Sequence, residues 1–127
     1  MSSRPSLGVL ELSVPADPAL ALTARIFAGA VGEHLEEVTP EDLKLAFSEL
    51  LAAAVDAGSE RIVFRADLER AEVLVAGAGP LGVGADGDLE EHEHFAGIHR
   101  ADLLTALFPG LRAEGEEVVL PLRSASA

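Results

Sequence analysis

One carboxylate inside an apolar helical stretch is the side chain of this protein best placed to do chemistry. The segment from Thr39 to Val55 has the period of a single helix, and Glu49 lies within its apolar part. Burying a carboxylate there is costly unless the group is paired or used. The residue one turn on, on the same face, is Ala53, which can bind neither a metal nor a phosphate. Glu49 is therefore either a general base acting on a bound ligand or a helix residue bonded to a backbone group at the sheet edge.

Two other patterns suggest chemistry and are set aside. Gly77, Gly79 and Gly82 match a Gly-x-Gly-x-x-Gly pattern after a strand-like run, as in flavin- and nicotinamide-binding fingerprints. That site needs a helix directly after the glycines to present N–H groups to pyrophosphate, and here further glycines and acidic residues follow. Glu90, His92 and His94 alternate and could converge on a metal only in an extended segment. We expect a solvated acidic loop there and no metal site.

The elements that position these residues follow from alternation and helix-cap signals. Asp17-Pro18 and Thr39-Pro40 each place a capping residue before a proline at the first helical position. The segment 77–96 has no period and is expected to form a lid-like loop that lacks regular helix and is mobile. Strands are predicted over residues 9–14, 61–67, 71–76, 111–113 and 117–122, and helices over 18–32, 40–57 and 99–108.

Hairpins combined with helices on one side predict an α+β fold. We expect a two-layer α/β sandwich, with a mixed, mostly antiparallel sheet that carries three helices on one face. The 127 residues are expected to form a single domain, 1–127, with an ordered core over 8–123.

Composition excludes several classes of function. The net charge of -13, from 22 acidic against 9 basic residues, repels phosphate backbones and argues against direct nucleic-acid binding. There is no cysteine, so a disulfide framework and a thiol nucleophile are excluded. No apolar run reaches the ~18 residues that a membrane span needs, and no signal peptide is recognised, so we expect a cytoplasmic protein with no membrane partner.

The segment Ser48-Glu49-Leu-Leu-Ala-Ala53-Ala-Val resembles the first nucleotide motif of the GHKL (histidine-kinase-like, Bergerat-fold) ATPase domains. The branch it is most similar to is that of the small anti-sigma-factor serine kinases. Their motif is Glu-x-x-x-Asn, in which Glu is the general base and Asn binds magnesium. The order of segments from Leu10 to Leu122 also fits, so the resemblance covers nearly the whole chain. It implies a nucleotide site between the helices and a lid.

The resemblance assigns roles to positions in this sequence. Glu49 retains the general-base position, and Ala53 stands where the magnesium ligand belongs. Gly77 replaces the Asp of the second motif, Asp-x-Gly-x-Gly, whose side chain accepts the adenine amino group. Gly79 keeps the central glycine, and Leu81 replaces the last one.

The third motif and the last strand also depart from the family pattern. Gly97 is the one glycine that remains of the phosphate-binding end of the lid. His99 and Arg100 follow it and could contact an anion. Glu116 stands where the family has a threonine before the last strand.

Two hypotheses about function follow from these departures from the family motifs. In the first, the chain is an anti-sigma-factor-like regulatory protein with a degenerate ATP site, no cofactor and no metal. It would act by binding a sigma factor or a STAS-type antagonist, and the family often forms homodimers. In the second, it is an active serine kinase that uses ATP and Mg²⁺ to phosphorylate its antagonist, with Glu49 as base and Asp56 as a substitute metal ligand. The first reading predicts that ATP binds more weakly than about millimolar. If the site is a decayed one, Ala53→Asn with Gly77→Asp should raise the affinity for ATP.

Overall fold

The computed structural model describes residues 8–35, 38–79, 94–95 and 98–122. The strands are β1 (Val9–Pro15), β2 (Arg61–Asp67), β3 (Glu72–Ala76), β4 (His94–Phe95), β5 (Ile98–His99), β6 (Arg112–Glu114) and β7 (Glu117–Pro121). The helices are η1 (Pro18–Leu20, a 3₁₀ turn), α1 (Ala21–Gly32), α2 (Pro40–Asp56) and α3 (Arg100–Leu107).

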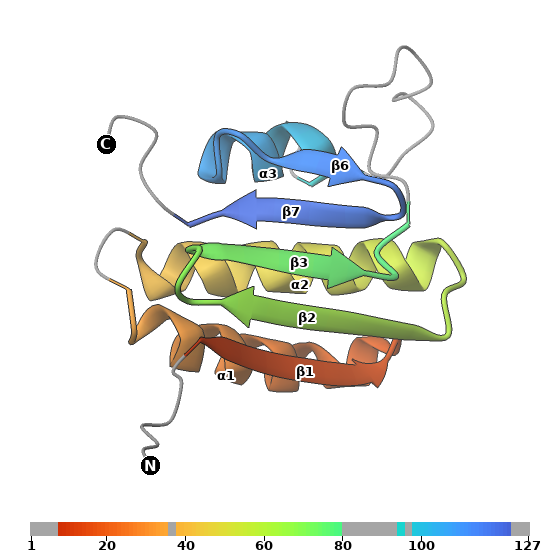
Figure 1. Cartoon of the computed structure of the whole chain (residues 1–127). Helices are drawn as coiled ribbons and strands as arrows, with labels where there is room; N and C mark the ends of the chain where they lie inside the picture. Colours follow the sequence, from red (N-terminus) through yellow and green to blue (C-terminus); the bar gives the residue numbers. More distant parts are fainter. Residues whose placement is uncertain (1–7, 36–37, 80–93, 96–97, 123–127) are drawn as a thin grey trace.

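Five of the strands form one sheet in the order β1-β2-β3-β7-β6 (Figure 1). Every neighbouring pair in it is antiparallel, so this sheet is antiparallel throughout where the sequence suggested a mixed one. The connections between the strands explain why neighbouring strands run in opposite directions. Tight hairpins join β2 to β3 and β6 to β7, and the α1–α2 pair returns the chain so that β2 runs against β1.

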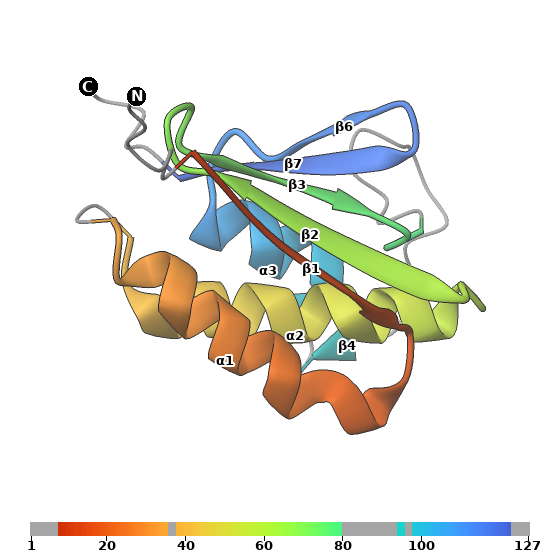
Figure 2. The ribbon, with the colours of Figure 1, turned by 60° about the horizontal axis from the view of Figure 1, so that its bottom comes forward.

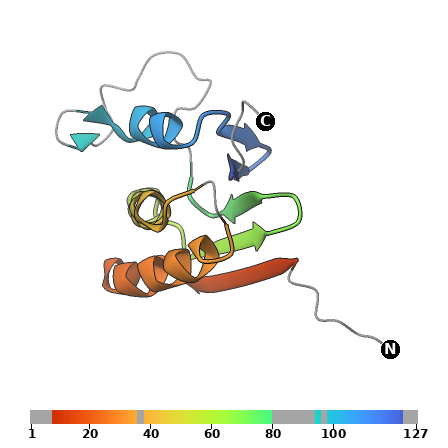
Figure 3. The ribbon, with the colours of Figure 1, turned by 90° about the vertical axis from the view of Figure 1, so that its left-hand side faces the viewer.

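Helices α1, α2 and α3 all cover the same face of this sheet (Figures 2 and 3). In Figure 1, α1 lies behind β1 and α2 lies behind β2 and β3. The predicted α+β fold with three helices on one face is confirmed. In the part of the chain that the structure describes, no helix combines the length and apolarity needed to cross a membrane.

The two capping signals start helices where the sequence predicted. Asp17 Oδ1 accepts a hydrogen bond from the Ala19 N–H at 2.9 Å, and Thr39 Oγ1 accepts one from the Asp42 N–H at 3.3 Å. The first turn after Asp17 is 3₁₀ rather than α-helical. At the far end of α2, Ala57 was predicted to be the last residue of the helix. That residue is the C-cap and is exposed, because the helix ends at Asp56 before Gly58 turns the chain away.

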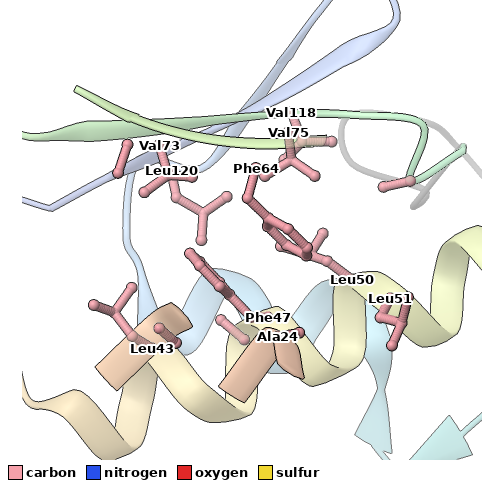
Figure 4. Close-up of a cluster of buried hydrophobic side chains, with 14 of the residues drawn as sticks. Ala24, Leu43, Phe47, Leu50, Leu51, Phe64, Val73, Val75, Val118 and Leu120 are labelled. Carbon is pink, nitrogen blue, oxygen red and sulfur yellow. The ribbon is translucent and has the colours of Figure 1, made fainter. Parts of the chain in front are cut away.

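The core lies between α2 and the sheet. The Phe47 ring of α2 stacks on the Phe64 ring of β2, with ring centroids 4.4 Å apart (Figure 4). The centroid of the Phe47 ring also lies 6.1 Å from that of the Phe27 ring of α1. Phe47 and Phe64 are fully buried. This aromatic stack fixes the rotation of α2, and so it also fixes the flank of the helix on which Glu49 lies.

The region around the predicted lid is described only in part. Residues 80–93 and 96–97 lie outside the described residues, so the predicted lack of helix and the mobility there stay predictions. The described residues add a short antiparallel pair, β4 with β5, in which His94 is opposite His99. His99 therefore belongs to a strand, and the third helix starts one residue later than predicted, at Arg100.

Candidate functional site

Glu49 has a polar partner that the sequence did not reveal. Its Oε1 accepts a hydrogen bond from Arg100 Nε at 3.1 Å, and the two groups form an ion pair. The side chains are only 13% and 16% exposed, so the pair is largely shielded from water. Because Arg100 is the first residue of α3, this contact ties the start of α3 to the flank of α2.

The same guanidinium holds a second carboxylate. Arg100 Nη1 lies 3.2 Å from Asp56 Oδ2, and the Asp56 side chain is 49% exposed. Glu49 and Asp56 are seven residues apart on α2, which places them two turns apart on one flank. One arginine therefore bridges a shielded and a half-exposed carboxylate, a geometry that suits the planar fork of donors in its side chain.

This arrangement explains why a carboxylate can lie on the apolar helix. From the sequence, the structural alternative for Glu49 was a bond to a backbone group at the sheet edge. In the structure its partner is instead the Arg100 side chain. A cation offsets the cost of its burial, so no ligand is needed to explain its presence. From the sequence, Arg100 was predicted to be able to contact an anion, and Asp56 was a candidate substitute metal ligand. The structure gives both groups protein partners.

The position expected to carry the magnesium ligand is enclosed. Ala53 is 4% exposed and belongs to the hydrophobic core. The loop after β3 lies over the end of α2 here. A Cβ atom added to Gly79 would stand 2.6 Å from Ala57 Cβ and 3.9 Å from the Ala53 carbonyl oxygen. Small residues on both sides let the loop and the helix approach closely.

The position expected to carry the adenine acceptor cannot hold a side chain without distortion. Gly77 has a φ of +95°, in the region that favours glycine. A Cβ atom added there would come closer than 3.0 Å to the Arg61 carbonyl oxygen and would also crowd Ile62 Cα. A single change to Asp would therefore not simply supply an acceptor at Gly77, because the backbone there is not placed to carry a side chain.

The remaining candidate positions give less information. Gly97, Leu81 and the pair Glu90 and His92 lie outside the described residues. Glu116 is in the tight turn between β6 and β7 and is exposed. Within the described residues no group of three or more His, Cys, Asp or Glu side chains could hold a metal ion.

The described side chains do not fit ATP with Mg²⁺. The metal-ligand position is an enclosed alanine, the acceptor position is a glycine that tolerates no Cβ, and Glu49 is paired with Arg100. Two carboxylates and one guanidinium leave the Glu49–Arg100–Asp56 cluster with a net negative charge, which disfavours a triphosphate beside it.

Comparison with known proteins does not assign this chain to a family. The sequence matches no protein-family model, and a search of curated proteins finds no significant match.

Proposed function

We propose that this chain is a regulatory domain of the anti-sigma-factor type that acts by binding another protein in the cytoplasm and has a degenerate nucleotide site. The observation that supports this most is the bridge from Arg100 to Glu49 and Asp56. The Glu49 carboxylate accepts from an arginine of the same chain, so an ion pair within the fold accounts for its position without a bound nucleotide.

The two missing nucleotide groups support the same proposal. Neither Ala53 nor Gly77 can be replaced by the family's functional residue without disturbing packed surroundings. A site that has merely lost two side chains would leave room for them. Packing that leaves no room for either group supports a domain that acts through its protein surface.

The proposed partner is a sigma factor or a STAS-type antagonist. The net charge of -13 favours a partner with a basic surface and disfavours direct contact with nucleic acid. No cofactor takes part in the proposed function.

The test is to titrate this protein with the purified sigma factors and STAS-domain proteins of its own source organism, with and without ATP and Mg²⁺. We expect at least one complex of micromolar or tighter affinity, equal within error in both conditions. Incubation with labelled ATP should leave the antagonist unphosphorylated. ATP-dependent binding, or transfer of phosphate to a serine of the antagonist, would instead identify an active serine kinase.

A further inference from the structure

The face of the five-stranded sheet that is turned away from the helices has apolar side chains at its centre. Figures 1 and 2 show that no helix covers this face in the part of the chain that the structure describes. Val63 of β2, Leu74 and Ala76 of β3 and Val119 of β7 alternate with core residues, and none of the four belongs to the core. Ala76 is opposite Val63 and Leu74 is opposite Val119, so the four are neighbours. β3 and β7 are thus largely apolar on both faces, a pattern typical of strands that are covered on both sides.

The chain itself covers one end of this group. Arg112 of β6 reaches across β7 to Glu72 of β3, with Nη2 3.9 Å from Oε1. Arg112 is opposite Val119 in the β6–β7 pair, and Val119 is only 1% exposed. The other three apolar residues remain partly exposed, and we call them the apolar patch: Val63, Leu74 and Ala76.

Charged side chains of opposite sign border the two sides of the apolar patch. Arg61 and Arg65 lie on the same face of β2 and are exposed. Neither forms an ion pair with a described carboxylate, although Glu11 of β1 is opposite Arg65. On the other side, Glu117 begins β7 and Glu116 precedes it in the turn, and both are exposed without a cation among the described residues. This border complements a partner that is acidic on one side and basic on the other.

The dimensions of the apolar patch fit an α-helix. β2 and β7 flank β3, so the arginine side and the glutamate side are about 10 Å apart, at about 4.8 Å for each step between strands. A helix with its side chains is about 10–12 Å across. Arg61 and Arg65 are four residues apart on a strand, which is about 13 Å and close to the 11 Å or so of two helical turns. A helix lying along β3 therefore brings two residues of one flank, seven apart in its sequence, beside the two arginines.

We infer that the uncovered face of the sheet binds an amphipathic helix of the protein partner, whose apolar side covers the apolar patch. Acidic residues on one flank of that helix pair with Arg61 and Arg65, and basic residues on the other flank lie beside Glu116 and Glu117. The identity of the partner rests on the proposed function. The surface is separate from the Arg100 cluster, because the helices that carry this cluster lie on the opposite face of the sheet (Figure 2).

The affinity for the sigma factors and STAS-domain proteins of the source organism tests this surface. Leu74→Glu and Arg65→Glu should each raise the dissociation constant of the complex by about 10-fold or more. Leu22→Glu and Arg25→Glu are the matched controls, because they make the same substitutions at exposed positions of α1, and they should leave it unchanged. Circular dichroism establishes that each variant is folded, and if Leu74→Glu is not, Arg65→Glu decides.

A synthetic helical peptide tests the same surface without the natural partner. The peptide has about 18 residues, with leucines along one side, glutamates on one flank and lysines on the other. Fluorescence anisotropy should give a dissociation constant below about 1 mM for the wild-type protein and weaker binding to Arg65→Glu. A second peptide with lysines on both flanks should bind Arg65→Glu more tightly than wild type. Arg25→Glu controls for the change in net charge.

The two measurements separate a failure of the surface from a failure of the proposed function. A partner protein that binds Leu74→Glu and Arg65→Glu as tightly as wild type overturns the inference and leaves the proposed function standing. Affinity that falls in Leu22→Glu but not in Leu74→Glu also overturns it, because the interface then lies on α1. Binding of the peptide as expected, with no sigma-factor or STAS complex, supports the surface and contradicts the proposed partner. A wild-type protein that binds neither the peptide nor any of these proteins overturns both.

Discussion

Replacing Gly77 by Asp is expected to destabilise the protein by about 3–5 kcal/mol rather than restore a nucleotide site. The new Cβ would meet the Arg61 carbonyl oxygen of the neighbouring strand. The backbone would also have to keep a φ of +95°, which residues other than glycine rarely adopt. Backbone atoms at the start of β2 cannot move aside without breaking the β1–β2 ladder. Urea unfolding of parent and variant measures the difference, and the affinity for ATP should not rise.

Gly58→Asp is the control for this prediction. Gly58 also has a positive φ, +76°, but an added Cβ there would have no neighbour within 4 Å. The same substitution should therefore cost only the backbone strain, about 1–2 kcal/mol. Equal losses of stability in the two variants would mean that the surroundings of Gly77 make room for a side chain. An acceptor for adenine could then be introduced at that position.

Replacing Arg100 by Met should lower the free energy of unfolding by about 2 kcal/mol. Methionine keeps much of the apolar stem of the side chain but removes the guanidinium, so Glu49 is left shielded from water without its cation. The half-exposed Asp56 loses much less, because water can solvate it. Chemical denaturation of the variant measures the loss.

A double-mutant cycle separates this ion pair from general packing. Glu49→Gln combined with Arg100→Met should cost less than the sum of the single changes, with a coupling of about 1–2 kcal/mol. Asp56→Asn serves as the matched control and should cost below about 0.5 kcal/mol. Strict additivity of the Glu49 and Arg100 changes would show that the pair contributes nothing to the fold.

Local signals in the sequence predicted most of the fold. A capping side chain followed by proline depends on only a few neighbouring residues, and both such sites start helices as expected. The strand bounds of β2 were predicted without error for the same reason, since alternation is a local property. The buried surface of α2 was underestimated, because the helix is covered by α1, α3 and the sheet. Leu51 and Ala53 are buried in addition to the stripe that helical periodicity predicts, namely Leu43, Ala46, Phe47, Leu50 and Ala54.

The site could be predicted only in part, because its key contact is long-range. Glu49 and Arg100 are 51 residues apart, and no periodic pattern links a helix residue to the first residue of a later helix. The sequence did single out Glu49, Asp56 and Arg100 individually. It could not show that they meet. The close approach of Gly77 to Arg61 was equally hidden, since it depends on how β3 leaves the sheet beside β2.

Calorimetric titration of Mg²⁺–ATP into the wild-type protein tests the central claim, that the Arg100 bridge and the packed loop have replaced a nucleotide site. Arg100→Met and a titration with Mg²⁺ alone provide the comparison. We expect no binding tighter than about 1 mM, roughly -4 kcal/mol, in either protein, because removing Arg100 frees Glu49 but supplies neither a metal ligand nor an adenine acceptor. Micromolar affinity in the wild-type protein would contradict the account, because ATP would then be bound without the groups that the resemblance assigns to it.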